Sequence, residues 1–172
     1  KLGIEVCILA DSADAPALQR SDRAFLAGAD ASASLGAFLD ACDVLTFDKE
    51  AVADELLARL ASAVQRGRPA IYPGLDTLGL LKDKARQKRW MRDHRLPTLP
   101  FEIIETRPAS LRPLTATLGN ALVQKCRSGG YDGRGVQILE TVESPQALWD
   151  TPSILEPFLP DCQEISVVTV RA

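Results

Sequence analysis

The sequence predicts a protein in two parts, an α/β part followed by an α+β part. Over residues 1–78, short apolar β-type runs alternate with segments of helical spacing, which is typical of a parallel sheet joined by helices. A strongly charged helical segment and a proline-containing connector follow at 79–100. Within 101–172, a glycine-rich loop joins two further β-type runs. We therefore place one domain at 1–78, a linking helix and connector at 79–100, and a second domain at 101–172.

The first part is predicted to hold a parallel sheet. Four short apolar runs are expected to be strands: 4–10, 23–27, 43–47 and 69–73. Two helices are expected between them. Residues 34–41 have helical character, and 51–65 carry apolar side chains at helical spacing before Gly67, a natural helix stop.

The second part opens with a charged helix. Residues 78–95 hold nine charged side chains, and their apolar residues are spaced as in an amphipathic helix. The connector 96–100 contains two prolines, and each proline disfavours helix in the residue before it. Beyond it we expect strands at 101–105, 121–126, 136–139, 154–158 and 164–170, with helices at 108–118 and 144–149.

Composition excludes several functional classes. A net charge of −3 argues against a nucleic-acid-binding surface. No apolar run approaches the roughly 18 residues of a membrane span, and no basic-then-apolar signal segment opens the chain. His94 is the only histidine, which argues against Ser-His-Asp chemistry and histidine-rich metal sites. The four cysteines form no C-x-x-C pair, so we expect free thiols and a cytoplasmic protein.

The most informative stretch is the loop that follows Lys125. It carries two arginines and the four glycines Gly129, Gly130, Gly133 and Gly135. Glycine permits positive φ and lets backbone N–H groups approach an anion, while arginine can grip a phosphate with two parallel hydrogen bonds. We interpret it as a loop that covers nucleotide phosphates. A glycine-rich hairpin turn with solvated charges is the alternative, but a tight turn needs about two residues rather than eight.

A second candidate element is Glu156, in an extended apolar run, with Glu164 eight residues later. A carboxylate beside extended backbone can accept a hydrogen bond from an adenine amino group, and a later carboxylate can hold two ribose hydroxyls. Exposed glutamates at a strand edge are the alternative. We favour nucleotide binding because both residues lie downstream of the glycine loop.

The stretch Lys-x-x-x-Gly-Gly-Tyr-Asp-Gly-Arg-Gly resembles the N5-carboxyaminoimidazole ribonucleotide synthetases, ATP-grasp enzymes of purine biosynthesis. The resemblance implies a truncated Rossmann-like (pre-ATP-grasp) domain followed by part of an ATP-grasp domain. It also implies ATP-dependent carboxylation of 5-aminoimidazole ribonucleotide by bicarbonate, through carboxyphosphate. Residues 83–88, 97–100 and 43–52 are similar to further segments of the family, so the likeness runs nearly end to end.

The resemblance also implies roles for individual residues. Arg134 is the candidate catalytic residue, and the candidate substrate-binding residues are Tyr131, Arg134 and Glu50. The candidate ATP-binding residues are Lys84, Lys125, Gly129, Gly130, Asp132, Gly133, Gly135, Glu156, Phe158, Leu159 and Glu164. Within this set Lys125 would hold phosphates, Glu156 the adenine and Glu164 the ribose.

Three positions depart from the family pattern. Lys84 replaces an arginine, which keeps the charge but loses bidentate phosphate binding. Asp48 replaces a glutamate and is one methylene shorter. Val136 occupies the place of a glutamine, and Gln137 is expected on the other face of its strand.

Family members also carry segments that lie outside these 172 residues. They begin with a strand and a glycine-rich turn before the equivalent of Lys1, and their two magnesium carboxylates come later than Ala172. We therefore expect ATP with Mg²⁺ ligands beyond residue 172, no metal ligand in this chain, and a homodimer like its relatives. Two alternatives stay open: another ATP-grasp carboxylate–amine ligase, or a non-catalytic nucleotide-binding module.

Overall fold

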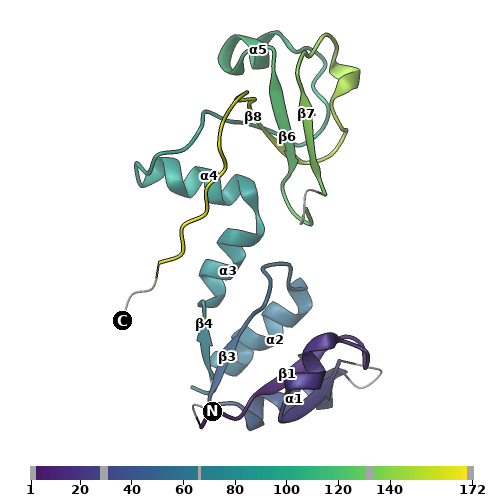
Figure 1. The fold of residues 1–172 in the computed structure, drawn as a ribbon, viewed down its shortest axis with the longest axis vertical. Coiled ribbons are helices and arrows are strands. Elements are labelled where there is room, and N and C mark those ends of the chain that lie inside the picture. Colours follow the sequence, from purple (N-terminus) through teal and green to yellow (C-terminus); the bar gives the residue numbers. More distant parts are fainter. Residues whose placement is uncertain (1–2, 28–30, 66, 131–133, 170–172) are drawn as a thin grey trace. The chain divides into compact units, whose positions relative to one another are not determined.

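The computed structural model describes residues 3–27, 31–65, 67–130 and 134–169 (Figure 1). The chain divides into two compact units, Lys1–Gly79 and Leu80–Ala172. Each unit has its own buried apolar cluster. The helix α3 (Leu75–Lys82) contains the limit between the units.

The first unit contains parallel strands and helices, as the alternating pattern predicts. β1 (Cys7–Ala10) pairs with β2 (Arg23–Leu26), and β3 (Val44–Thr46) pairs with β4 (Ala70–Tyr72). Between paired strands lie η1 (Pro16–Arg20) and α2 (Asp54–Val64), and α1 (Ala31–Ala41) joins the two pairs. The strands form two separate two-stranded sheets rather than one sheet, because β1 and β3 are not bonded to each other among the described residues.

The core of the first unit lies where the helices face the strands. Its buried members are Leu35, Phe38, Leu39, Leu45, Leu60 and Ala63. Leu60 and Ala63 lie three residues apart on α2, so one face of that helix carries the burial. This agrees with the helical spacing of the sequence.

The second unit is built on a four-stranded antiparallel sheet. Its strands are β5 (Glu102–Ile104), β6 (Leu122–Cys126), β7 (Val136–Leu139) and β8 (Ser153–Pro157), in the order β5-β8-β6-β7. One face of the sheet packs against α5 (Arg112–Leu118) through a core that includes Leu114, Leu118, Leu122 and Leu155. Because side chains alternate along a strand, Lys125 and Glu156 belong to the other face.

The predicted helix at 78–95 is interrupted. It consists of α3 and α4 (Lys84–Asp93), and Asp83 between them has extended backbone, with φ −115° and ψ 106°. The Asp83 carboxylate accepts from the N–H groups of Ala85 and Arg86 and so caps α4. A strong N-cap signal thus begins a new helix in the middle of a continuous amphipathic pattern.

Two other predicted helices are shorter than expected. The helix predicted at 108–118 begins only at Arg112. The one predicted at 144–149 is a short 3₁₀ helix, η2 (Pro145–Ala147).

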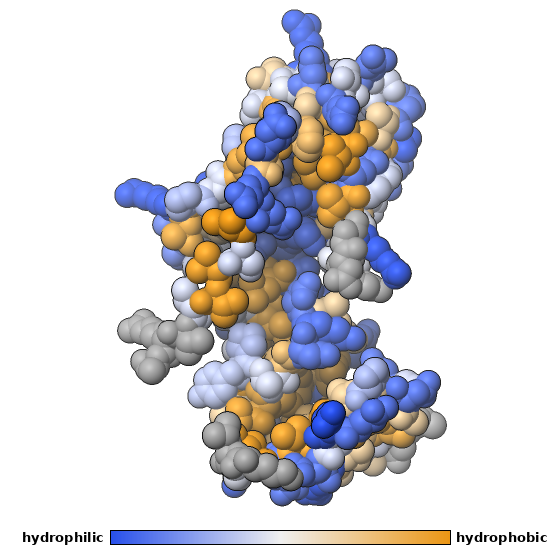
Figure 2. Space-filling view, viewed as in Figure 1, coloured by the Kyte–Doolittle hydropathy of each residue, from blue (hydrophilic) through white to orange (hydrophobic). Residues whose placement is uncertain are grey.

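The predicted strand at 164–170 is wrong for residues 164–169, which form no regular element. Ile165, Val167 and Val168 are 77%, 76% and 88% exposed. Figure 2 shows that hydrophobic residues form part of the molecular surface. A run rich in β-branched residues forms a strand only when another strand accepts its backbone hydrogen bonds, and none does here among the described residues. Residue 170 lies outside the described residues.

Candidate functional site

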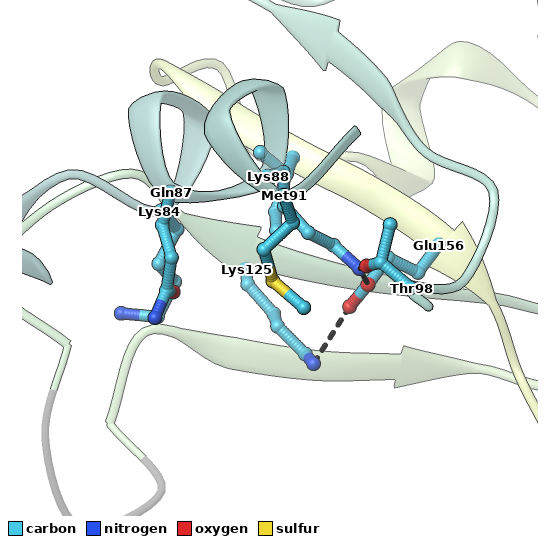
Figure 3. Close-up of a pocket in the computed structure, with 8 residues that line it drawn as sticks. Lys84, Gln87, Lys88, Met91, Thr98, Lys125 and Glu156 are labelled. Atoms are coloured by element: carbon cyan, nitrogen blue, oxygen red, sulfur yellow. Dashed lines mark hydrogen bonds and ion pairs between the residues drawn. The ribbon is translucent and has the colours of Figure 1, made fainter. Parts of the chain in front are cut away.

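A pocket of about 260 Å³ lies between α4 and the open face of the four-stranded sheet (Figure 3). It is lined by Lys84, Gln87, Lys88, Met91, Thr98, Lys125, Ile154 and Glu156. The four helix residues are spaced i, i+3, i+4 and i+7, which places them on one face of α4. Three lysines and one glutamate leave two positive charges uncompensated in this pocket, so it suits an anionic ligand.

Glu156 is the centre of the charge arrangement. The residue is only 4% exposed, and its Oε2 lies 2.7 Å from Lys125 Nζ, while its Oε1 pairs with Lys88 Nζ. Burial alone would raise the pKa of Glu156, but the hydrogen bonds and charges of Lys125 and Lys88 outweigh it and hold the pKa below its ordinary value. The carboxylate is therefore ionised at neutral pH, and it orients both lysines.

Lys88 is a site residue that sequence reasoning missed. Besides Glu156, its ammonium group contacts the hydroxyl of Thr98, donates to the Leu99 carbonyl at 3.4 Å and lies 5.6 Å from the centre of the Phe101 ring. Lys88 thus joins α4 to the connector and to β8. Its position four residues after Lys84 on one helical face is the signal that could have identified it.

The glycine loop has a narrow neck. Cys126 N–H donates to the Gly135 carbonyl at 2.8 Å, and a Cβ added at Gly130 would lie 2.7 Å from the Arg134 carbonyl oxygen. Gly135 has φ +71°, where side chains are disfavoured. Lys84 Nζ reaches the Gly130 carbonyl at 3.5 Å, so α4 and the loop approach each other at the pocket.

A buried amide network lies on the face of the four-stranded sheet opposite the pocket. Gln124 is completely buried; its Nε2 donates to Trp149 O at 3.1 Å and to Ser153 Oγ at 3.0 Å. Its Oε1 accepts from Gln137 Nε2 at 2.6 Å and from Trp149 N at 2.9 Å. Gln137 therefore lies on the face opposite the pocket, as the sequence predicts, and it pairs across the sheet with Gln124.

No group of three or more His, Cys, Asp or Glu side chains in the described part of the chain is arranged to hold a metal ion. Within the described ranges, every helix is too short or too polar to cross a bilayer.

Comparison with known proteins gives the family. Residues 1–80 match the model of the ribonucleotide synthetase preATP-grasp domain, and residues 89–172 match that of the ATP-grasp domain. All of the chain aligns, at 34% identity, with the N5-carboxyaminoimidazole ribonucleotide synthase of Synechococcus elongatus. This chain belongs to the N5-carboxyaminoimidazole ribonucleotide synthase family.

Solved structures of the family share the fold. The N5-carboxyaminoimidazole synthetase of Staphylococcus aureus, complexed with ADP, has a TM-score of 0.76 at 23% identity; the match covers 90% of this chain and 41% of that one. The carboxyaminoimidazole ribonucleotide synthase of Aspergillus clavatus, complexed with ATP, has a TM-score of 0.71 at 26% identity, covering 92% and 42%. This chain spans 43% of the Synechococcus protein and less than half of the other curated relatives first matched.

The structure brings together only part of the residue set that the family resemblance implies. Lys84, Lys125 and Glu156 line one pocket. Gly129, Gly130 and Gly135 lie in the loop beside it, together with Arg134, which is exposed. Tyr131, Asp132 and Gly133 lie outside the described residues.

Four further candidates of the synthase set have other surroundings. The Phe158 N–H donates to the Ala121 carbonyl at 2.9 Å, so this group is already bonded. Leu159 is 45% exposed just after β8. Glu164 is exposed on the segment without regular structure, and Glu50 is exposed in the first unit, after β3. Phe158, Leu159 and Glu164 are not among the residues that line the pocket, and Glu50 belongs to the other unit.

Proposed function

We propose that the intact protein catalyses ATP-dependent carboxylation of 5-aminoimidazole ribonucleotide by bicarbonate, an ATP-grasp ligase reaction that forms a C–N bond. ATP would phosphorylate bicarbonate, and carboxyphosphate would pass its carboxyl group to the exocyclic amine of the ribonucleotide, releasing phosphate. The observation that carries this proposal is the lysine-lined pocket around Glu156, beside the glycine loop. It lies in a chain 34% identical to a named synthase of this type.

The pocket supports binding of ATP. Lys125 and Lys84 line the pocket and offer ammonium groups for the phosphates. The family resemblance implies further phosphate contacts from the backbone of Gly129, Gly130, Asp132, Gly133 and Gly135. Glu156 and the backbone at Phe158 and Leu159 are the proposed adenine contacts, with Glu164 for the ribose. Because Glu156 already serves two lysines, accepting from adenine would require it to share an oxygen.

The ribonucleotide would bind through Tyr131, Arg134 and Glu50. Arg134 is always charged and offers five donors, which suits it to both the substrate phosphate and an anionic intermediate. In Arg134→Ala we expect near-normal ATP affinity and no ribonucleotide-dependent turnover. Retained turnover would remove the substrate role from Arg134.

Mg²⁺ would accompany ATP and neutralise phosphate charge during transfer. The pocket does not fit the metal, because its single carboxylate is paired with two lysines and its other charged groups are cations. We expect the Mg²⁺ ligands to come from residues beyond 172, and we derive no step from the metal.

The acceptor is tested by incorporation of labelled bicarbonate. The longest available form of the protein, supplied with MgATP and 5-aminoimidazole ribonucleotide, should transfer the label to the ribonucleotide. Asp48 and Lys84 differ from the family pattern, so a different amine acceptor is the second candidate. Label transfer only to another amine would favour that ligase, and ATP binding without any transfer would favour a non-catalytic nucleotide-binding module.

We further propose a homodimer in the cytoplasm. The dimer is suggested by the family resemblance alone. A reducing compartment is suggested by Cys7, Cys42, Cys126 and Cys162, which are all free thiols. Light scattering and cell fractionation test the two statements separately.

A further inference from the structure

Arg127 joins several segments at the point where the glycine loop begins. It follows β6 directly, its N–H donates to the Pro152 carbonyl at 3.0 Å, and its carbonyl accepts from the Lys84 N–H at 2.9 Å. One residue therefore bonds the start of the loop to the entry of β8 and to the first turn of α4.

The Arg127 side chain adds a charged connection to the same turn. Its Nε donates to Asp83 Oδ1 at 3.2 Å and its Nη2 to Asp83 Oδ2 at 2.6 Å, a two-point pairing, while Nη1 donates to Glu105 Oε1 at 2.7 Å. The side chains of Arg127 and Asp83 are 22% and 20% exposed, whereas that of Glu105 is 64% exposed. The pair with Asp83 is thus shielded from solvent, and the contact with Glu105 is a weaker surface contact.

Asp83 therefore has two tasks. Its Oδ1 caps α4 by accepting from Ala85 N at 2.8 Å, and its Oδ2 faces Arg127. Burial alone would raise the pKa of Asp83, but the bonds from Arg127 and from the first turn of α4 hold it below its ordinary value. Both partners are charged at neutral pH, and the pairing fixes the helix start relative to the loop start.

We propose that the Asp83–Arg127 pair positions Lys84 against the glycine loop for binding of nucleotide phosphates. Lys84 follows Asp83 directly; its N–H is held by Arg127, and its Nζ lies 3.5 Å from the carbonyl of Gly130. The backbone N–H and the side-chain ammonium group of Lys84 therefore both contact the segment that begins the glycine loop. Asp83 and Arg127 are positioning residues that act through Lys84. The inference rests on the proposed function in that the ligand is ATP.

The sharpest variant is Asp83→Asn. Asparagine keeps the Oδ1 oxygen for the cap but places an amide NH₂ against the Arg127 Nη2 donor, so the helix start is retained while the negative charge and the two-point pairing are lost. In the longest available form of the protein, we expect affinity for a non-hydrolysable ATP analogue to fall about tenfold, the effect of losing one charge-assisted hydrogen bond. Affinity for adenosine, which has no phosphate, should be unchanged.

Further variants separate positioning from stability. In a Lys84→Ala background, Asp83→Asn should reduce ATP-analogue affinity by less than about twofold, because the positioned group is gone. Glu105→Gln, which removes the charge of the exposed partner of Arg127, is the matched control and should bind normally. Arg127→Lys keeps the charge without the two-point geometry and should bind more weakly than the parent; it replaces Asp83→Asn if that variant does not fold.

The outcomes are distinct. Asp83→Asn could lower the affinities for the ATP analogue and for adenosine equally, or lower the ATP-analogue affinity by the same factor with and without Lys84. Either result would overturn the positioning role and show that the Asp83–Arg127 pair only stabilises the fold. Unchanged binding in both Asp83→Asn and Arg127→Lys would also overturn it while the proposed function stands. A parent protein that binds no ATP analogue would overturn the proposed function and the positioning role with it.

Discussion

Lys125 Nζ and Glu156 Oε2 lie 2.7 Å apart on neighbouring antiparallel strands, and the same carboxylate pairs with Lys88 on α4. The two lysines share one anionic partner that is nearly inaccessible to solvent. Separating such buried groups is costly, so their geometry is fixed before a ligand arrives. The excess positive charge remains for an anion, and this relationship carries the first two predictions.

Lys125→Ala should weaken ATP binding by more than ~1.5 kcal/mol, the low end for a charged hydrogen bond. Isothermal titration measures the change directly. Arg59→Ala, which removes one exposed positive charge from α2, controls for net charge and should bind like the parent. Equal affinities of Lys125→Ala and Arg59→Ala would remove Lys125 from the phosphate site.

Glu156→Gln should lower the free energy of unfolding at pH 7 by about 3 kcal/mol, because it leaves Lys88 and Lys125 without their partner. Since the pKa of Glu156 is lowered in the folded protein, its stabilising contribution is full above the ordinary value of 4.5 and is lost as pH falls through the lower, folded value. The difference between parent and variant should therefore shrink below pH 4.5. Urea unfolding across this range checks it, and a difference that grows on acidification would contradict the assignment.

Gly130→Ala should open the neck of the glycine loop. The added Cβ would lie 2.7 Å from a backbone carbonyl oxygen, a contact that no side-chain rotation relieves. We expect a stability loss of about 1–3 kcal/mol, as for overpacking, together with weaker ATP binding. Gly74→Ala is the matched control, since its Cβ would meet no atom within 4 Å. Indistinguishable thermal unfolding and ATP affinity of the two variants would show that the neck is not closed.

Gln124→Leu tests the amide network beneath the pocket. Leucine fits the buried position but leaves Trp149 N without its acceptor and removes one partner each from Gln137 and Ser153. We expect a loss of about 2 kcal/mol in unfolding free energy, typical of buried groups left unsatisfied. Gln146→Leu, at an exposed position, should be nearly neutral. A similar small effect at both positions would mean that the network contributes no net stability.

The sequence predicts those features of this fold that depend only on neighbouring residues in the chain. The strands that contain Lys125 and Glu156 follow from apolar β-type runs. The amphipathic face of α4 follows from helical spacing, and the position of Gln137 follows from side-chain alternation. The segment 164–169 is rich in β-branched residues but has no bonded strand partner among the described residues, so residue type alone misassigns it.

Contacts between residues far apart in the chain could not be predicted from the sequence. A hydrophobic run says which side chains are buried but not which strand accepts their backbone bonds, so neither the order β5-β8-β6-β7 nor the two separate sheets was predicted. The pairing of Asp83 with Arg127 joins residues 44 positions apart. The role of Lys88 likewise depends on Glu156, which lies on a strand far along the chain.

Phosphate release by the longest available form of the protein is the most direct measurement. It is made with MgATP and bicarbonate, with and without 5-aminoimidazole ribonucleotide. We predict strong stimulation by the ribonucleotide, abolished in Lys125→Ala. ATP binding without stimulation would contradict the proposed acceptor, and absence of ATP binding would contradict the assignment of the pocket around Glu156.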